Sequence, residues 1–416
     1  MPLFKSNSAE RDALAQAAAI SRSQAVIEFK MDGTIITANQ NFLDAMGYRL
    51  DEIQGKHHQM FAPPELRGSE AYKAFWANFN RGKRSIALNL KAEQGREIAE
   101  ALVRQADVLV QNYRPHAMER LGLGPDDVRK LNPKLVYLSV IGFSSTGPNR
   151  ERLGFDVAAQ AESGMMSLTG ERQEMPLRIG YPVVDVACTH IGAEAVLGAL
   201  VGRSRTGKGS NIEISMFDVA VHLQNVPLST YLDLGIEPVR SGNGQPYNAP
   251  SADVVEATDG QVVISAYPDE HWARLCNLIE RPDLVSDERF ISNDTRVAHR
   301  PAMLAELNDA LASFDAEKLA RVLADNAIVG GVVRTYPQLV ESDEFIHGRF
   351  VVDSLSADGR RAHAVRPPYQ LSENPLSNVL PGLGEHTLEV LAELGFDQDA
   401  IDRLQGDDVV RAMRST

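Results

Sequence analysis

From residue 85 onward, short apolar runs alternate with segments of helical periodicity. Residues 85–90, 108–113 and 135–143 are apolar runs of strand length. Residues 95–106 and 125–131 carry apolar positions three and four apart, which is typical of amphipathic helices. Alternating strands and helices predict βαβ units and a mostly parallel sheet, which binds ligands at the carboxyl ends of its strands.

One long segment shows this pattern most clearly. An apolar extended run ends at Asp185, a helix rich in Ala and Leu extends to the cluster Arg203–Gly209, and a strand at 211–215 leads into a further helix. A carboxylate at the start of a helix is either an ordinary N-cap or a nucleophile displayed at the positive end of the helix dipole. Spacing alone favours the N-cap.

Two other interpretations of this segment fail. The spacing from Gly202 to Lys208 is that of a phosphate-binding loop, but Gly209 replaces the required Ser or Thr, and the segment follows a helix rather than a strand. We therefore expect a helix C-terminus with cationic residues. Cys188 and His190 stand two residues apart on the helix, so they point to different faces and do not form a catalytic dyad.

The first 80 residues follow a different pattern. Residues 1–24 predict a helix, 25–30 and 34–38 predict two strands around the turn Met31-Asp32-Gly33, 39–46 a short helix, and 69–82 an amphipathic helix. This order resembles a PAS sensor domain, most specifically in the segments IEFKMDGTIITANQNFLDAMGY and GKHHQMFAPPE.

The PAS resemblance breaks off before three further strands that such a domain should contain. His57 and His58 could contact a haem or a metal, but a polar loop after a helix is the favoured interpretation. Haem or flavin in this segment is therefore possible only as an alternative, and we expect no metal.

Composition and charge narrow the class of protein. The chain has 416 residues, 44% of them hydrophobic, which is enough for two or three domains. A net charge of −14 disfavours nucleic-acid binding but allows a local cationic pocket. Two cysteines exclude a disulfide framework and suit a reducing cytoplasm. We find neither a secretory signal nor an apolar run of ~18 residues, so we expect a cytoplasmic protein without a membrane span.

Residues 81 to about 352 resemble the family III CoA-transferases. The matching segments are RGKRSIALNLK, ADVLVQNYRPHAMERLGLG, LNPKLVYLSVIGFSSTGP, LGFDVAAQAESGMMSLTG, YPVVDVACTHIGAEAVLGAL, TGKGSNIEISMFDVA and DGQVVI. The resemblance implies an α/β fold, with a Rossmann-like large lobe that lacks its usual first strand–helix unit and a smaller α/β lobe. It also implies an interlocked homodimer.

This resemblance divides the chain into four parts. Residues 1–80 form the N-terminal helix and the truncated PAS-like segment, and residues 81–235 the large lobe. Residues 236–345 form the smaller lobe, and residues 346–416 return to the large lobe.

The resemblance also assigns roles to residues. It implies that Asp185 is the nucleophile that carries CoA between an acyl-CoA and a free carboxylic acid, through an anhydride and an aspartyl-CoA thioester. Backbone N–H groups at the start of its helix are expected to stabilise the oxyanion. The implied CoA contacts are Leu88, Lys91, Asn112, Tyr113, Arg114 and Arg120.

Further residues are implied near the reacting carboxylate. Asp156 matches an acidic residue beside it, and Gly242 and Gly244 belong to a loop that covers the active site in some members of the family. Phe155 stands where the racemase branch has a histidine, and it cannot move a proton, so racemisation is disfavoured. We expect residues 240–250 to help select the acyl groups.

The unusual N-terminus leaves three hypotheses open. The chain is a working CoA-transferase, a PAS-type sensory protein whose second part is a scaffold, or a fusion whose two incomplete parts have impaired transferase activity.

Overall fold

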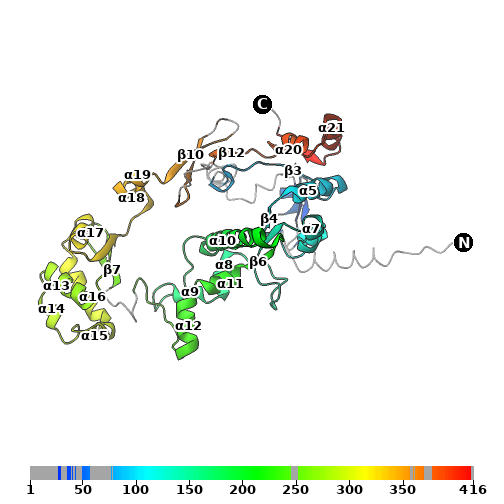
Figure 1. Cartoon of the computed structure of the whole chain (residues 1–416). Coiled ribbons are helices and arrows are strands. Elements are labelled where there is room, and N and C mark those ends of the chain that lie inside the picture. The colour runs from blue at the N-terminus through cyan, green and yellow to red at the C-terminus, as the bar shows by residue number, and fades with distance from the viewer. Residues whose placement is uncertain are drawn as a thin grey trace. The chain divides into compact units, whose positions relative to one another are not determined.

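The computed structural model describes residues 27–29, 35–38, 40, 43, 49–56, 76, 78–244, 252–356, 359, 361–369 and 377–413. The predicted helix at 1–24, the turn Met31-Asp32-Gly33, the pair His57 and His58, and most of the helices predicted at 39–46 and 69–82 lie outside these residues. Figure 1 labels the helices and strands of the chain and colours them in chain order. The chain divides into two compact units. One comprises Met1–Ala87, Glu344–Val390 and Arg411–Thr416, and the other Leu88–Asp343 and Leu391–Val410.

The second unit begins with a parallel sheet, and we call residues 88–244 the parallel-sheet lobe. Its strands are ordered β4-β5-β6, and both pairs are parallel, with Val108 opposite Val136 and Tyr137 opposite Asn211. The strands are β4 (Val108–Gln111), β5 (Val136–Ile141) and β6 (Asn211–Ser215). The helices are α5 (Glu93–Gln105), α6 (Ala117–Arg120), α7 (Pro125–Leu131), α8 (Asp156–Glu162), α9 (Met165–Leu168), α10 (Val183–Thr206), α11 (Met216–His222) and α12 (Asn225–Leu234). The predicted βαβ arrangement is confirmed here.

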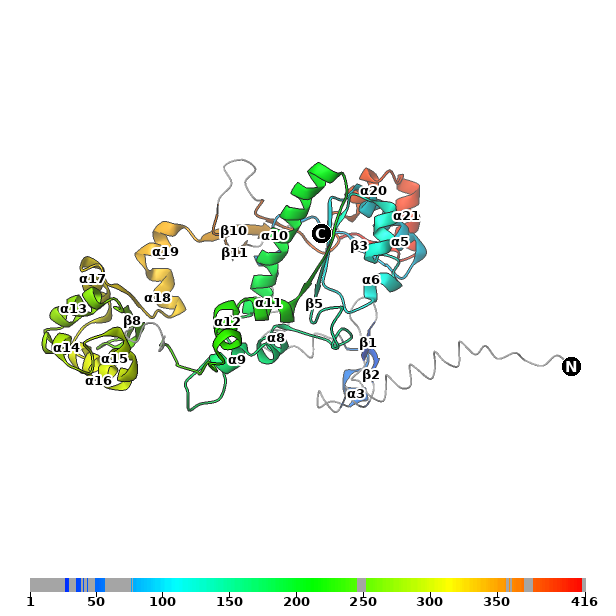
Figure 2. The same ribbon diagram turned by 60° about the horizontal axis from the view of Figure 1, so that its bottom comes forward.

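The long helix α10 lies along strand β5, and α8 and α11 are its neighbours (Figure 2). It begins at Val183, two residues before the predicted opening at Asp185, and ends at Thr206, followed by the C-cap Gly207 with a φ of 70°. Arg203 in its last turn bonds the Asp107 carboxylate at 2.8 Å. Gly209 passes so close to the backbone of Leu135 that a Cβ would lie 1.9 Å from its carbonyl oxygen. The glycines of this segment therefore end a helix, as predicted, and do not form a phosphate loop.

The helix α10 is also apolar enough, over its 24 residues, to cross a membrane by length and composition. This is weak support for a membrane span, because helices that pack on a sheet often pass the same test. Its buried residues Val184, Cys188 and Gly192 pack in the same core as Leu138 and Ile214 of the sheet. The opposite side leaves apolar side chains exposed, among them Val186, Leu197 and Val201.

Residues 252–343 form what we call the antiparallel lobe. Its sheet has the order β7-β8-β9, with antiparallel neighbours throughout. Its strands are β7 (Ala252–Glu256), β8 (Gln261–Ser265) and β9 (Val329–Val332). Its helices are α13 (Asp269–Leu278), α14 (Asp283–Ser286), α15 (Asn293–Ala298), α16 (Arg300–Leu311), α17 (Ala316–Asp325) and α18 (Tyr336–Glu341).

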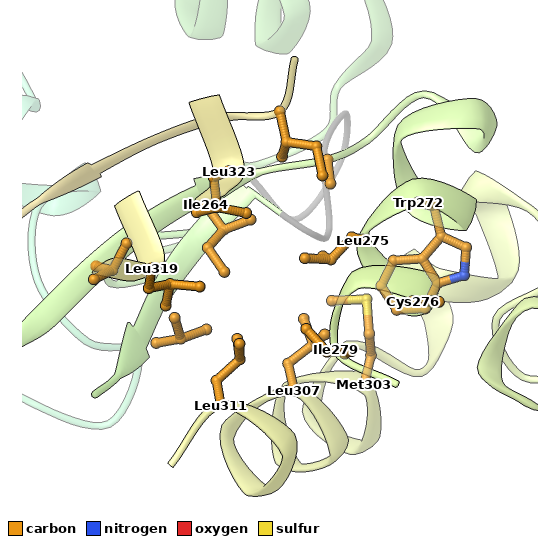
Figure 3. Packing of buried hydrophobic residues seen from close by; sticks show 14 of the residues in the cluster. Ile264, Trp272, Leu275, Cys276, Ile279, Met303, Leu307, Leu311, Leu319 and Leu323 are labelled. Carbon is orange, nitrogen blue, oxygen red and sulfur yellow. The ribbon is translucent and has the colours of Figure 1, made fainter. Parts of the chain in front are cut away.

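The core of this lobe is built from buried residues of its helices together with strand residues such as Ile264 of β8 (Figure 3). Leu275, Leu311, Leu319 and Leu323 are fully buried there. The buried Arg296 guanidinium stacks 5.3 Å from the ring of Trp272 and donates to the Asp269 carboxylate at 2.6 Å. A buried charge needs such partners, so this arginine belongs to the packing of the lobe.

The remaining elements belong to the first unit or to the segments at its boundary. They are β1 (Ile27–Phe29), β2 (Ile35–Ala38), α3 (Leu50–Ile53), β3 (Ala87–Leu88), α19 (Asp343–Gly348), β10 (Val351–Ser356), β11 (Arg361–Val365), β12 (Val379–Leu380), α20 (Thr387–Glu393), α21 (Gln398–Gly406) and β13 (Val410–Arg411). Strands β1 and β2 form the predicted antiparallel hairpin, with Ile27 opposite Ala38. The helix α3 was not predicted. The helices α20 and α21 are the short helices of the C-terminal segment.

Candidate active site

The candidate nucleophile Asp185 is the third residue of α10, and the helix is capped from another part of the chain. The N-cap residue is Pro182, which has no side-chain acceptor to offer. Instead, Oδ2 of Asp156, the first residue of α8, accepts hydrogen bonds from the backbone N–H groups of Val184 at 2.8 Å and Asp185 at 3.3 Å. Asp185 is therefore not the N-cap of its helix, and the N-cap interpretation of this residue is wrong.

The two aspartates have different environments. Asp156 uses both carboxylate oxygens, because Oδ1 accepts from Nε2 of Gln160 at 2.6 Å. The Asp185 side chain is exposed, and its carboxylate accepts no hydrogen bond from the residues that the structure describes. Although Asp185 is exposed as a residue, neighbouring atoms partly desolvate its carboxylate, and this desolvation is the first cause that raises the pKa of Asp185; the charge of Asp156 is the second. A carboxylate without partners and with a raised pKa has its electron pairs free to attack a carbonyl carbon.

The backbone donors at the start of α10 are already occupied. Besides the two N–H groups bound to Asp156, Val183 donates to the carbonyl oxygen of Tyr181 at 2.7 Å and Val186 to that of Pro182 at 3.1 Å. In this structure these four N–H groups are therefore not free to bind an oxyanion, and their role in catalysis stays a prediction. The charge of Asp156 already compensates the positive end of the helix dipole.

The position of Asp156 depends on the loop between β5 and α8, residues 142–154. Gly142 and Gly154 touch at its two ends, so closely that a Cβ on Gly142 would lie 2.5 Å from the Cα of Gly154. Within the loop, Arg152 stacks 5.0 Å from the ring of Phe143 and forms an ion pair with Glu162 of α8. This closed loop leads from β5 into α8, whose first residue Asp156 lies beside the start of α10.

The same loop lines a cavity that extends along β5 and β6 and reaches the carboxyl ends of β4 and β5, the edge of the sheet where the topology predicts a ligand site. The cavity measures about 130 Å³. Its lining residues come from β4, β5, β6 and the segments that follow β4 and β5: Gln111, Tyr113, Arg114, Pro115, His116, Met118, Glu119, Pro125, Ser139, Ile141, Ser145, Arg150, Glu151, Asn211 and Glu213. Two of the predicted CoA contacts, Tyr113 and Arg114, are among them.

The charges around this cavity are mixed. His116, held at a positive φ of 60°, contacts the Glu151 carboxylate at 3.1 Å, and this hydrogen bond is the main cause that lowers the pKa of Glu151. Arg150 also lies 3.5 Å from the same carboxylate. Glu213 accepts a hydrogen bond from the backbone of Ser145 at 2.9 Å. Arg114 also lines this cavity, and no ion pair of its guanidinium is described within the part of the chain that the structure covers.

The other predicted contacts lie outside this cavity. Leu88 is partly buried at the end of β3, Lys91 is exposed immediately before α5, and Asn112 and Arg120 are exposed after β4 and at the end of α6. The structure therefore brings together Tyr113 and Arg114 but not the whole predicted set.

The predicted glycine loop is tied to a second loop. Gly242 has a φ of 59° and donates its backbone N–H to the carbonyl oxygen of Gly170 at 3.1 Å. The Arg240 guanidinium donates to the carbonyl oxygens of Glu171 at 3.1 Å and Glu174 at 2.9 Å. A turn closes where Ser241 Oγ donates to the carbonyl oxygen of Gly244 at 2.8 Å. Residues 245–250 of the predicted selecting loop lie outside the described residues.

The two cysteines are buried thiols with raised pKa values. Cys188 and Cys276 are free, as expected, and both are buried. Burial is the main cause that raises the pKa of Cys188 to about 11 and that of Cys276 to about 12, so neither thiol is activated. The described residues also contain no group of three or more His, Cys, Asp or Glu that could hold a metal ion.

Comparison with known proteins agrees with this geometry. The model of the family described as CoA-transferase family III matches residues 54–387. The chain belongs to this family. A succinate–glutarate CoA-transferase from Agrobacterium fabrum is 32% identical over 345 residues, which cover 82% of this chain and 86% of that protein. A succinyl-CoA:mesaconate CoA-transferase from Haloarcula marismortui is 35% identical over 347 residues, with the same coverage of 82% and 86%.

A solved structure supports the fold of this CoA-transferase. The crystal structure of a CaiB/BaiF family protein from Brucella suis matches with a TM-score of 0.69 and 32% sequence identity, over 77% of this chain and 84% of that one. The enzyme thus catalyses CoA transfer between an acyl-CoA and a carboxylate. The family match begins at residue 54, earlier than the predicted boundary at residue 81, and so includes part of the segment that was interpreted as PAS-like.

One site residue was missed in the sequence. Gln160 is fully buried and joins Asp156 to the segment before α10, where its Oε1 accepts from the backbone N–H of Ile179 at 2.9 Å. The spacing of Asp156 and Gln160, four residues apart on a helix, is a signal for such a side-chain pair.

Proposed function

We propose that this CoA-transferase works through Asp185 as a covalent nucleophile. The observation that supports this most directly is the contrast between two neighbouring carboxylates. Asp156 is saturated with hydrogen bonds, while Asp185 has no described donor and a pKa raised by burial and by Asp156. Of the two, only Asp185 is free to form a bond with a substrate.

The reaction then balances in four steps. A carboxylate oxygen of Asp185 attacks the thioester carbon of the donor, the C–S bond breaks, and CoA thiolate leaves an acyl-aspartyl anhydride. The thiolate attacks the aspartyl carbon of the anhydride, which releases the donor acid and forms an aspartyl-CoA thioester. The acceptor carboxylate displaces the thiolate to form a second anhydride. The thiolate finally attacks the acceptor acyl carbon and restores Asp185.

Mass spectrometry of the enzyme with acyl-CoA alone tests this proposal. We expect a peptide that contains Asp185 to carry the mass of CoA, and this adduct to be absent in Asp185→Asn. An active enzyme that never carries CoA on this peptide would disprove the covalent role.

We further propose that the cavity beside β4 holds part of CoA, with Arg114 meeting a phosphate and Tyr113 facing the nucleotide. Leu88, Lys91, Asn112 and Arg120 would contact other parts of this long molecule. Cationic side chains suit phosphates, and the carboxyl end of a parallel sheet suits a nucleotide. We expect Arg114→Ala to raise the KM for acyl-CoA by about tenfold with little change in kcat, since hydrogen bonds to charged groups contribute about 1.5–3 kcal/mol.

The names of the two relatives suggest which acids this enzyme accepts. Both relatives named above act on CoA esters or acids of short dicarboxylates, so we propose short dicarboxylic acids as acceptors, selected in part by residues 240–250. A panel of dicarboxylic and monocarboxylic acids with one acyl-CoA donor tests this. Equal rates with long-chain fatty acids would contradict it.

We also propose a homodimer located in the cytoplasm. The apolar side of α10, with Val186, Leu197 and Val201, and the exposed Val226 and Leu232 of α12 form apolar surface that a second copy would cover. Two free thiols suit a reducing compartment. Sedimentation of the purified enzyme and fractionation of its cells test the two statements.

A sensory role for the PAS-like segment is the second candidate. It is supported by the hairpin β1–β2, while the family match favours the transferase for the chain from residue 54 onward. A visible absorption spectrum with haem or flavin bands would support the sensor. Wild-type transferase activity after removal of residues 1–53 would leave the hairpin without a catalytic role.

A further inference from the structure

We infer that Gln160 is a positioning residue for CoA transfer, because its buried amide joins Asp156, which caps α10, to the segment that leads into α10. The inference rests on the proposed role of Asp185, which stands on the first turn of that helix.

The geometry makes Gln160 the centre of a short chain of hydrogen bonds. Its Nε2 donates to Oδ1 of Asp156 at 2.6 Å, and its Oε1 accepts from the N–H of Ile179 at 2.9 Å. The second oxygen of Asp156 accepts from Val184 at 2.8 Å. The amide thus holds both the cap of α10 and the chain four residues before α10 begins.

The side chain has no solvent to replace these bonds. Gln160 is fully buried, so a lost partner would leave a buried polar group unsatisfied. Without the amide donor, nothing described would hold Oδ1 of Asp156, and its carboxylate could turn away from the N–H groups of Val184 and Asp185. The first turn of α10 would then loosen, and the carboxylate of Asp185 would move with it.

A movement of the Asp185 carboxylate should lower the rate of the chemical steps more than it weakens the binding of acyl-CoA. A displacement of about 1 Å at a reacting group can lower a rate by about 100-fold. The cavity that holds Tyr113 and Arg114 is not lined by Gln160, Asp156 or Asp185. We therefore expect Gln160 variants to lower kcat while the KM for acyl-CoA changes less than about threefold.

Two substitutions separate the two bonds of Gln160. Gln160→Leu removes both. Gln160→Glu keeps an acceptor for the N–H of Ile179 but replaces the donor to Asp156 with a carboxylate that repels it. We expect both variants to lower kcat by about 10- to 100-fold, with Glu at least as damaging as Leu.

Gln224 offers a matched control at the other end of α8. Its Nε2 donates to the backbone oxygen and to Oγ of Ser163, both at 3.2 Å, so it too joins this helix to another segment. Gln224→Leu removes a comparable bond without touching Asp156, and we expect its kcat to stay within about twofold of the wild type.

Hydrogen exchange gives a readout that does not depend on activity. In both Gln160 variants the amide of Val184 should exchange faster than in the wild type, and in Gln224→Leu it should not. This measurement also decides the case if Gln160→Leu folds poorly, because Gln160→Glu can be compared with the wild type on its own.

The outcomes are distinct. Wild-type kcat in Gln160→Glu, or equal losses in Gln160→Leu and Gln224→Leu, would overturn the inference while leaving Asp185 as nucleophile. Full activity of Asp185→Asn would instead remove the proposed function on which the inference rests. A kcat loss confined to the Gln160 variants, with faster exchange at Val184, supports it.

Discussion

The antiparallel lobe and the parallel-sheet lobe bury their apolar residues to different extents. In the antiparallel lobe, the ten-residue helix α13 buries Trp272, Leu275 and Cys276. In the parallel-sheet lobe, the 24 residues of α10 bury only Val184, Cys188 and Gly192, and Leu197 remains 63% exposed.

Charged groups show the same contrast. The buried Arg296 of the antiparallel lobe is paired with Asp269 and stacked on Trp272. In the parallel-sheet lobe, the Asp185 carboxylate has no described donor and lies near Asp156, which raises its pKa. The antiparallel lobe pairs this buried charge within itself, whereas the parallel-sheet lobe leaves the Asp185 carboxylate without a described donor and one side of α10 apolar and exposed. Stability and chemistry should therefore respond to mutation in different lobes.

Asp185→Asn should give the largest effect. The amide is a poor nucleophile, so we expect CoA transfer to fall on the order of 10⁴-fold, measured as exchange of CoA between an acyl-CoA and a free acid. Stability should not fall. A carboxyl whose folded-state pKa is raised stabilises the fold at low pH, and this contribution is lost as the pH rises through that pKa. At neutral pH the variant should therefore melt at the same or a slightly higher temperature, and a marked drop in Tm would give Asp185 a structural role.

Leu275→Ala should have the next largest effect, and on stability alone. Leu275 is fully buried, and truncation in such a core costs about 2–5 kcal/mol of unfolding free energy. Chemical denaturation measures this loss, and the activity per folded molecule should not change. Leu197→Ala on α10 is the matched control, for which we expect a change within about 0.5 kcal/mol in the monomer. Equal losses in the two variants would break the contrast between the lobes.

Asp156→Asn should affect rate and pH dependence together. In Asn an NH2 group replaces one of the two carboxylate oxygens and cannot accept a hydrogen bond, so the bond from either Gln160 or Val184 is lost, and we expect kcat to fall about 10- to 100-fold. Loss of the negative charge should lower the pKa of Asp185, since Asp156 helps to raise it. The acid limb of the kcat/KM profile should move to lower pH. An acid limb that stays in place would mean that it does not report Asp185.

Leu197→Glu should have the smallest effect on the stability and activity of the monomer. It tests whether the apolar side of α10 is the surface that a second copy covers. A charge on this apolar side should raise the dimer Kd by about tenfold or more in sedimentation experiments. Leu383→Glu, which changes an exposed leucine outside this helix, is the control and should leave self-association unchanged. No difference between the two variants would exclude this side of α10 as the interface.

Much of the architecture could be predicted from local patterns. The bounds of α7 and β6 agree with the prediction, because Pro125 opens α7 and an apolar strand follows the glycines at 207 and 209. The helix α10 was predicted with its C-terminal glycine but begins two residues early, since Pro182 and not Asp185 precedes its first turn. Helix starts that are capped from a distance carry no local signal.

The arrangement of the candidate active site also depends on contacts between residues that are distant in the sequence. Asp185 could be proposed from the family resemblance, and Asp156 could be placed near it. That Asp156 occupies the N–H groups at the start of α10 could not be foreseen, because Val184 lies 28 residues away in the chain. Gln160 accepts a hydrogen bond from Ile179, which lies 19 residues further along the chain. Only its spacing of four residues from Asp156 on a helix could have indicated its role.

In this CoA-transferase, the order and type of the residues alone determine the positions of most strands and helices. They place alternating strands and helices, a carboxylate at the head of a long helix, and a glycine at its end, because periodicity, proline and glycine act within a few residues. Folding in three dimensions decides which of two aspartates is bound and which is free. That choice depends on buried hydrogen bonds between distant segments, whose strength comes from the exclusion of water.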